Sequence, residues 1–252
     1  MDLSLVITAK NEEKDLPSCL DSVKDLASEI IFVDDNSTDK TREIAEKYNA
    51  KIFIRTFDNY SNQKNYALKQ ASGKWILHLD PDEKLTPELA REIKQVISDA
   101  NQTYDGFYIP YTNYFLGKNM KHGGLGKEKH LRLFKKTTAG FGKGLVHEGI
   151  KTEGKTSQLK NKIIHNSYPD MEEYLKKFNR YTTLAARQMH KEGKKFSYFK
   201  LLSFPFEFHK RYTLRLGFLD GIAGLIWAGL SAFYVVVKYA KLWQMEKNKN
   251  VK

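Results

Sequence analysis

The first hundred residues alternate between short aliphatic runs and longer segments with helical spacing, and this alternation restricts the possible folds more than any other feature. The aliphatic runs cover residues 3–8, 30–33, 51–54 and 75–79, and the helix-like segments cover residues 12–26, 38–48, 62–71 and 86–98. Strands that alternate with helices pair in parallel through right-handed crossovers. The sequence therefore predicts an α/β domain with a half-Rossmann, mostly parallel sheet and helices on both faces.

Two helix starts are marked by capping residues. Thr86 followed by Pro87 is typical of a helix that opens with a threonine cap and a proline in its first turn. Ser37 or Thr38 is expected to cap the second helix in the same way.

The pattern changes after residue 104. Shorter strand-like pieces cover residues 104–111, 129–134, 146–151 and 160–165, and glycine-rich turns separate them at residues 123–126 and 140–144. Apolar residues then recur at helical spacing from about residue 171 onward. We therefore predict one α/β domain over residues 1–168 and a basic helical extension over residues 169–252.

Polar and acidic residues gather at the ends of the predicted strands. Three strands are followed by such residues, namely Thr8 and Glu12, Asp34 and Asp35, and Asp80 and Asp82. The carboxyl ends of parallel strands meet at one edge of the sheet, where ligands bind in this class of fold. Several carboxylates at one edge repel each other unless a cation or a hydrogen-bonding ligand relieves them.

Asp80 and Asp82 are separated only by Pro81. The fixed φ of proline bends the chain, so that both carboxylates can reach one centre instead of pointing to opposite faces of a strand. Mg²⁺ or Mn²⁺ suits such a pair, since hard cations favour carboxylates together with substrate phosphates. The alternative is a solvated turn that caps the following helix.

Asp34, Asp35 and Lys64 can likewise be interpreted either as ligand-binding residues or as ordinary residues of a turn or helix. Asp34 and Asp35 exceed what helix capping needs, and a carboxylate at a strand end can accept hydrogen bonds from a nucleotide base or ribose. Lys64 could face the same edge and offset diphosphate charge, or it could be a solvated residue of a helix.

Four sequence blocks occur in a fixed order, at residues 7–13, 33–41, 63–68 and 76–83. This series resembles the family 2 glycosyltransferases with the GT-A fold, and the resemblance extends over roughly residues 1–170. It implies that the predicted α/β domain is a nucleotide-sugar-binding catalytic domain.

The resemblance assigns donor-binding roles to individual residues. Thr8 and Asp35 match positions that contact the base of the nucleotide-sugar donor, with Glu12 and Asp34 nearby. Arg132 is a further candidate for a position near the donor.

The resemblance also implies a metal site and a base. Asp80 and Asp82 match the Asp-x-Asp motif, with Asp82 bonded directly to Mg²⁺ or Mn²⁺. His165 resembles the histidine that completes metal coordination in GT-A enzymes, although a lone histidine at a strand end is also commonly structural. Glu148 is assigned as the base that takes the proton of the acceptor, and Gly149 replaces the second acid expected there.

The order of motifs is most similar to the bacterial subgroup that elongates lipopolysaccharide core oligosaccharide. That subgroup implies inverting transfer of a hexose, glucose in the first instance, from a UDP-sugar to a glycolipid acceptor. A polyprenyl phosphate is an alternative acceptor. The net charge of +12 suggests a different alternative, a nucleic-acid-binding protein. An edge rich in carboxylates would repel nucleic acid, and we expect no such partner.

The net positive charge lies entirely within residues 151–252, because the first 150 residues carry equal numbers of basic and acidic side chains. Within this basic part, residues 217–237 contain a single charge, Asp220, and as a helix they would span about 31 Å. Spanning a membrane would leave five lysines beyond the segment on the outer side, against the positive-inside tendency. Contact with the membrane surface is therefore the first interpretation.

Two other interpretations of residues 217–237 remain, a packed helix and a true membrane span. Small residues spaced four apart would allow close helix packing, either within the chain or in a homodimer. The single Cys19 suits a reducing compartment. Together these features predict a cytoplasmic protein that is peripheral on the inner face of the cytoplasmic membrane.

Overall fold

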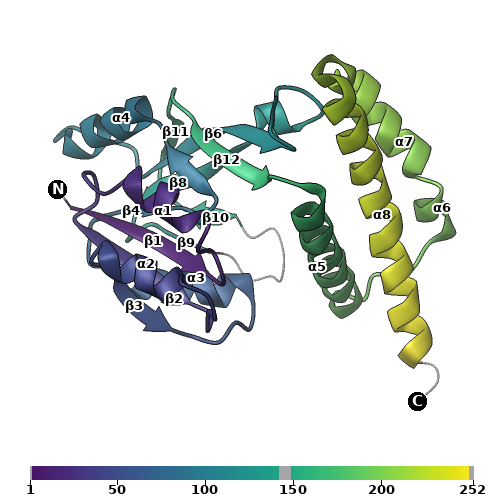
Figure 1. The fold of residues 1–252 in the computed structure, drawn as a ribbon, viewed down its shortest axis with the longest axis horizontal. Helices are drawn as coiled ribbons and strands as arrows, with labels where there is room; N and C mark the ends of the chain where they lie inside the picture. The colour runs from purple at the N-terminus through teal and green to yellow at the C-terminus, as the bar shows by residue number, and fades with distance from the viewer. Residues whose placement is uncertain (1, 142–148, 250–252) are drawn as a thin grey trace. The chain divides into compact units, whose positions relative to one another are not determined.

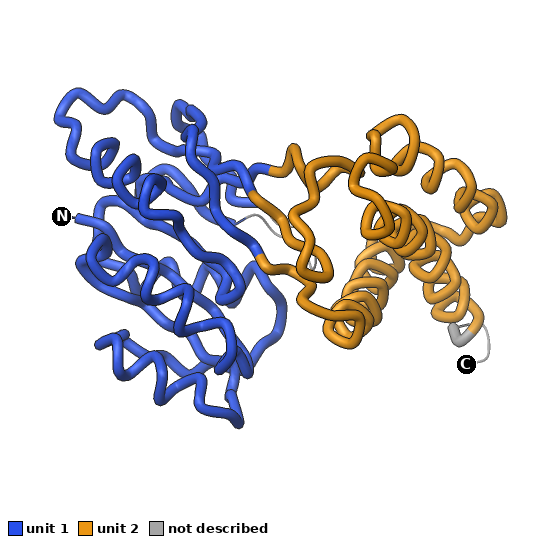
Figure 2. The backbone as a smooth tube through the Cα atoms, turned by 45° about the horizontal axis from the view of Figure 1, so that its top comes forward, with its two compact units in different colours: residues 1–111, 129–165 blue, residues 112–128, 166–252 orange. Residues whose placement is uncertain are grey.

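The computed structural model describes residues 2–141 and 149–249, and the chain forms two compact units (Figure 2). The first unit comprises residues 1–111 and 129–165, and the second unit comprises residues 112–128 and 166–252. Strands β6 and β12 run from one unit into the other.

The first unit is built on a mixed sheet with the strand order β3-β2-β1-β4-β8-β6-β12-β5 (Figure 1). Strands β3, β2, β1 and β4 are parallel, whereas β8 runs antiparallel to β4 and β6 runs antiparallel to β8. The strands of this sheet are β1 (Leu3–Ala9), β2 (Glu29–Asp34), β3 (Lys51–Ile54), β4 (Trp75–His78), β5 (Glu83–Leu85), β6 (Gly106–Phe115), β7 (Lys118–Met120), β8 (Lys129–Lys135), β11 (Thr156–Gln158) and β12 (Ile163–Tyr168), and β7 and β11 both pair with β6. Strands β9 (Ala139–Phe141) and β10 (Ile150–Thr152) form a separate antiparallel pair.

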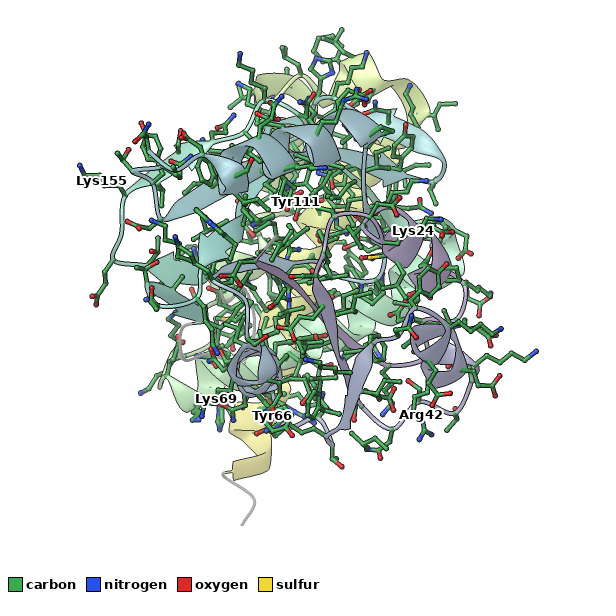
Figure 3. The ribbon with its side chains drawn as sticks, turned by 90° about the vertical axis from the view of Figure 1, so that its left-hand side faces the viewer. Lys24, Arg42, Tyr66, Lys69, Tyr111 and Lys155 are labelled. Carbon is green, nitrogen blue, oxygen red and sulfur yellow. The ribbon has the colours of Figure 1, made fainter. Side chains whose placement is uncertain are left out.

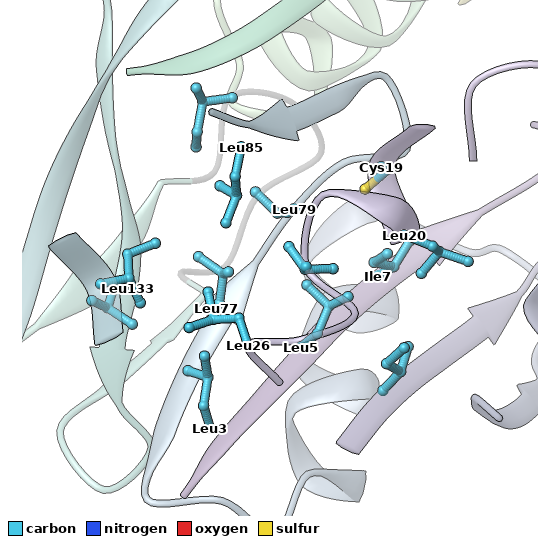
Figure 4. Close-up of a cluster of buried hydrophobic side chains, with 14 of the residues drawn as sticks. Leu3, Leu5, Ile7, Cys19, Leu20, Leu26, Leu77, Leu79, Leu85 and Leu133 are labelled. Atoms are coloured by element: carbon cyan, nitrogen blue, oxygen red, sulfur yellow. The ribbon is translucent and has the colours of Figure 1, made fainter. Parts of the chain in front are cut away.

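Helices cover both faces of the parallel part, as predicted. They are α1 (Leu16–Asp21), α2 (Thr41–Lys47), α3 (Tyr60–Gln70) and α4 (Pro87–Ser98). Alternate residues of β1 enter different cores, because successive side chains of a strand point to opposite faces. Leu5 packs with Leu20 of α1, as Figure 4 shows, whereas Val6 packs with Ala67 of α3. The predicted α/β class with helices on both faces is therefore confirmed.

Helix α1 is shorter than the predicted segment 12–26. Asn11 has a left-handed backbone with φ of 55°. The backbone N–H of Glu12 donates to Thr41 Oγ1 at 2.7 Å, and that of Glu13 donates to Asp39 Oδ2 at 3.2 Å. These bonds hold residues 11–13 against the loop after β2, so the helix begins only at Leu16.

One predicted cap is confirmed and the other is wrong. The Thr86 hydroxyl accepts a hydrogen bond from the N–H of Leu89 at 3.2 Å, and Pro87 begins α4. By contrast, α2 begins at Thr41, and the Ser37 hydroxyl accepts from the N–H of Asn11 at 2.9 Å. Ser37 therefore connects two strand ends instead of capping a helix.

Glu29, at the start of β2, joins three neighbouring segments. Its Oε1 accepts from the Ser4 hydroxyl at 2.5 Å and from the N–H of Ser72 at 2.6 Å, and its Oε2 lies 2.7 Å from Lys51 Nζ. Burial alone would raise the pKa of this carboxyl, but the bonds from Lys51, Ser4 and Ser72 outweigh it and lower the pKa to about 2.

We expect Glu29→Gln to lower the free energy of unfolding at pH 7 by about 2 kcal/mol. Because the folded pKa lies below the usual value of 4.5, this stabilisation is complete above pH 4.5 and is lost as the pH falls toward 2. The deficit of the variant should therefore shrink between these two values. Urea unfolding at a series of pH values measures it, with the exposed Glu46→Gln as the control. A deficit that did not depend on pH would contradict this role of the charge.

The second unit is mainly helical. Its elements are β7 (Lys118–Met120), η1 (Leu125–Lys127), α5 (Met171–Lys191), α6 (Tyr198–Leu201), α7 (Phe204–His209), the π-helical turn η2 (Lys210–Leu214), η3 (Gly217–Asp220) and α8 (Gly221–Lys249). Helix α5 packs against α8. Ala228 and Ala232, two of the small residues predicted to allow close packing, are fully buried, so one face of α8 is a packed face.

The second unit is not the single segment 169–252 that the sequence predicts, because residues 112–128 also belong to this unit. Asp220 holds residues 112–128 in the second unit through hydrogen bonds. Its carboxylate accepts from the N–H of Lys121 at 3.3 Å and from that of His122 at 2.8 Å. On the apolar side, Phe115 and Trp227 pack with ring centroids 5.4 Å apart. The sequence gives no sign of this contact, because the partners are about a hundred residues apart.

Residues Gly217–Lys247 form a helical stretch that is long and apolar enough to cross a membrane, judged by length and composition alone. Only 28% of its most apolar window is buried within the protein. The rest of that window is available for contact with another surface.

Candidate active site

The ends of β1 and β2 lie side by side and fix the Asp35 carboxylate. Ala9 and Asp34 are paired in the sheet, and the N–H of Asp35 donates to Ala9 O at 2.9 Å. Asp35 Oδ1 accepts from the N–H of Phe57 at 2.9 Å, and Oδ2 lies 3.2 Å from Lys10 Nζ. The carboxylate is therefore held in one orientation at this edge of the sheet.

Asp34 is fully buried beside it. Its Oδ2 accepts from the N–H of Ser37 at 3.0 Å and lies 3.5 Å from Arg42 Nε. Within the described ranges, Oδ1 of Asp34 has no hydrogen-bond partner. Asp34 thus shapes the turn after β2 and retains one unused acceptor oxygen.

Thr8 and Glu12 follow the same edge. Thr8 is half-buried and is paired with Val33 in the sheet. Glu12 is held through its backbone N–H by Thr41. Both residues therefore lie at the strand ends where the sequence predicts the donor base, and their contact with a base stays a prediction.

Asp80, directly after β4, lies between two cations. Its Oδ1 is 2.9 Å from Lys64 Nζ and its Oδ2 is 2.6 Å from Arg132 Nη2. Burial alone would raise the pKa of Asp80, but the positive charges of Lys64 and Arg132 outweigh it and hold the pKa well below its usual value. Asp80 is therefore ionised and firmly oriented.

Arg132, from β8, is buried, and all three nitrogens of its guanidinium group have hydrogen-bond partners. Its Nε donates to the hydroxyl of Tyr111 at 2.5 Å, its Nη1 is 2.5 Å from His78 Nδ1, and its Nη2 bonds both Asp80 and Glu83. Tyr111 is buried and is labelled near the middle of the view in Figure 3, whereas Lys155 lies at its edge. A buried guanidinium is stable only when it is paired in this way.

The surroundings set the charge states of the two other buried groups. Burial lowers the pKa of His78 well below its usual value, and the nearby charges of Lys64 and Arg132 lower it further. Neutral His78 can therefore accept a hydrogen bond from Arg132 through Nδ1. Burial also raises the pKa of Glu83, although Arg132 opposes that shift.

Asp82 and His165 form a second pair in the same region. His165 Nε2 lies 3.5 Å from Asp82 Oδ1, and the sheet pairs His165 of β12 with Glu83 of β5. The ring of Tyr111 packs edge-on against His165, with centroids 5.6 Å apart. Burial opposes protonation of His165, but its bond to Asp82 outweighs this effect and raises the pKa of the imidazole.

The Asp82–His165 pair offers a carboxylate oxygen, the ligand that Mg²⁺ and Mn²⁺ favour, and an imidazole nitrogen, a common ligand of transition metals. Among the described residues, no three His, Cys, Asp or Glu side chains are arranged to hold an ion by themselves. Since Asp80 is already engaged by two cations, Asp82 and His165 fit the role of direct ligands better than Asp80 does. Phosphate oxygens of a donor would have to complete such a site.

The structure therefore brings together Lys64, Asp80, Asp82, Arg132 and His165. It also adds three residues that were not among the predicted site residues, namely His78, Tyr111 and Glu83. The one sign of these three residues in the sequence was His78, a histidine inside the apolar run 75–79. Glu148, the predicted base, and its neighbour His147 lie outside the described residues.

Comparison with known proteins identifies the class. The model of the family described as glycosyl transferase family 2 matches residues 4–152, more than half of the chain. The chain belongs to glycosyltransferase family 2, and it is a glycosyltransferase with the GT-A fold. The predicted family is confirmed.

Particular relatives align over nearly the whole chain. An uncharacterized glycosyltransferase of Rickettsia typhi is 30% identical over 261 residues, covering 99% of this chain and 89% of the relative. The lipopolysaccharide core biosynthesis glycosyltransferase LpsC of Rhizobium meliloti is 31% identical over 261 residues, covering 97% and 93%. Among solved structures, TarS 1–349 of S. aureus has 17% identity and a TM-score of 0.48, covering 99% of this chain and 92% of that chain.

Proposed function

We propose that this chain is an inverting, metal-dependent hexosyltransferase that moves glucose from UDP-glucose to a glycolipid of the lipopolysaccharide core. The observation that carries the proposal is the pairing of Asp82 with His165 beside an Asp80 carboxylate fixed by Lys64 and Arg132. The likeness to LpsC, whose name gives lipopolysaccharide core biosynthesis, supports the choice of acceptor.

The residues of the first unit divide the work of donor binding. Thr8 and Asp35 would contact the base, and Lys64 would add positive charge beside the diphosphate. Asp82 and His165 would hold Mg²⁺ or Mn²⁺, which neutralises charge on a departing nucleoside diphosphate. Arg132 would act as a positioning residue, because it is buried and bonded on every side.

Transfer with inversion requires direct displacement at the anomeric carbon. The acceptor oxygen forms a bond to that carbon as the bond to the diphosphate oxygen breaks. A carboxylate takes the proton of the acceptor hydroxyl, and Glu148 is proposed for this step.

The second unit supports a membrane-bound acceptor. Large apolar side chains are exposed along its segment 198–222, namely Tyr198, Phe199, Leu202, Phe206, Leu214, Leu216, Phe218, Leu219 and Ile222. Basic residues lie in the same segment, namely Lys200, Lys210, Arg211 and Arg215. Aromatic and aliphatic groups mixed with basic ones suit the interface of an anionic bilayer. We therefore propose peripheral binding to the inner face of the cytoplasmic membrane.

A thermal-shift panel tests the donor and the metal together. We expect saturating UDP-glucose with Mn²⁺ to raise the Tm by at least about 5 °C, since a ligand at a hundred times its Kd adds about 2.7 kcal/mol of stability. UDP-glucose with a chelator, and GDP-sugars with Mn²⁺, serve as controls and should give much smaller shifts. Equal shifts with and without Mn²⁺ would rule out the metal-dependent mode of binding.

A further inference from the structure

A glycine turn and two arginines meet within the second unit, whereas the residues of the predicted donor site belong to the first unit. Gly124 has a left-handed backbone with φ of 107°, and a Cβ at this position would lie 2.7 Å from Arg215 Nη1 and 3.5 Å from Arg211 Nη1. Two guanidinium groups therefore flank one small space that only a glycine leaves open.

The π-helical turn η2 brings the two arginines to this place. The N–H of Arg215 donates to Lys210 O, five residues back, at 2.9 Å. The carbonyl of Arg215 accepts from the N–H of Gly123 at 2.9 Å, and Arg211 Nη1 lies 3.5 Å from Gly123 O. The turn and the glycines are thus held together by backbone bonds.

Two buried donors in this region lack a partner. In the part of the chain that the structure describes, Arg211 Nε and Trp227 Nε1 are buried and form no hydrogen bond. The Trp227 nitrogen lies 3.8 Å from the position of a Cβ on Gly123. A buried donor without a partner is destabilising, so an acceptor that reached these nitrogens would be favoured.

The acidic side chains near the two arginines, Asp220 and Glu207, bond other residues. Asp220 accepts from the N–H groups of Lys121 and His122, and its Oδ1 lies 3.2 Å from His122 Nδ1. Glu207 lies 3.7 Å from Lys210. Across the described residues, neither Arg211 nor Arg215 forms an ion pair. Burial and the charge of Arg215 lower the pKa of Arg211, as expected for two cations without a shared anion.

We infer that Gly123, Gly124, Arg211, Arg215 and Trp227 form a binding site for a phosphate group. Guanidinium groups match the oxygens of phosphate in a fork geometry, and a glycine turn permits close approach. The phosphate belongs either to a lipid at the membrane surface or to a soluble phosphate compound. The site goes beyond the proposed glycosyl transfer, and it is tested by binding alone.

The first arm of the test uses inorganic phosphate with the full-length protein. We expect phosphate to bind wild type and the double variant Lys191→Gln, Lys195→Gln alike, and Arg211→Gln, Arg215→Gln at least about tenfold more weakly. The lysine control also removes two positive charges, but it does so near the other end of α8. There the N–H of Phe196 donates to Glu246, which lies roughly 28 Å along the helix from Trp227.

Trp227→Phe is a second, milder variant in case loss of both arginines disturbs folding. It removes the N–H and keeps an aromatic ring for the contact with Phe115. We expect several-fold weaker phosphate binding with an unchanged Tm in the absence of phosphate. Circular dichroism and thermal unfolding check that each variant is folded.

The second arm distinguishes the two sources of phosphate. Vesicles of phosphatidylcholine carry either phosphatidic acid, a phosphate monoester, or phosphatidylglycerol at matched surface charge. A preference of wild type for phosphatidic acid that the arginine variant loses identifies a lipid phosphate. Binding of free phosphate without that preference identifies a soluble ligand. The inference is overturned if wild type binds neither probe, or if the arginine variant and the lysine control behave alike in both arms.

Discussion

Asp82→Asn is expected to lower kcat/KM for glycosyl transfer by roughly three orders of magnitude, because a bound cation contributes several kcal/mol to stabilising the leaving group. Asp82 lies 3.5 Å from His165, and this pair is the proposed metal-binding group. The variant keeps the size of the side chain and removes one charge. Steady-state rates with UDP-glucose at saturating Mn²⁺ measure the effect.

A second measurement separates loss of the metal from loss of the fold. The Mn²⁺-dependent part of the thermal shift with UDP-glucose should disappear in Asp82→Asn, while the Tm without ligands should stay close to that of wild type. Asp25→Asn, an exposed acid in the same unit, is the matched control and should leave both unchanged. Donor binding that keeps its full Mn²⁺ dependence in Asp82→Asn would remove Asp82 from the metal site.

Arg132→Met is expected to destabilise the first unit by about 3–5 kcal/mol, the typical cost of removing one partner from a buried ion pair. Methionine fills much of the same volume, so the main effect is electrostatic. Asp80 and Glu83 would both lose their common cation, and Glu83 is only 1% exposed. Urea unfolding at pH 7 measures the change.

The pH dependence of the stability of Arg132→Met tests whether the effect comes from the charges of the carboxylates. The pKa of Asp80 is held low in the wild type, so its stabilisation is present above the usual carboxyl pKa and is lost as the pH falls below it. The part of the Arg132→Met deficit that comes from Asp80 should therefore stay constant from pH 7 to about pH 4 and narrow only as the pH falls further, because Asp80 loses its charge there.

Two further variants control for simpler explanations of the Arg132 effect. Adding Glu83→Gln to Arg132→Met should recover part of the loss at pH 7, since one buried charge is then removed. The exposed Arg91→Met should change stability by less than about 0.5 kcal/mol. A deficit that stays the same between pH 7 and about pH 2 would indicate lost packing instead of an unpaired charge.

The buried network around Arg132 links the stability of the sheet to the orientation of Asp80. His78, on β4, and Tyr111, on β6, both bond the same guanidinium. If the donor binds beside Asp80 as proposed, its binding would depend on side chains that do not touch it. We expect substitutions of His78 or Tyr111 to weaken donor binding through Arg132.

The sequence by itself determined the order of the strands and helices in the first hundred residues. Periodicity encodes which side chains face a core, and strand ends in a parallel sheet necessarily share one edge. For this reason the sequence predicts that Asp35, Asp80 and Asp82 follow strands at one edge of the sheet. The family could be predicted because its four blocks are local in sequence. The Thr86 cap was equally local.

Only the tertiary structure decided how the charges pair. Arg132 is some fifty residues from Asp80 and Glu83, and nothing in the local pattern around it shows which carboxylates it meets. The same holds for residues 112–128, which join the C-terminal helices through Asp220. Periodicity reports burial within one element, whereas pairing between distant elements depends on how the sheet and the helices fold back on each other.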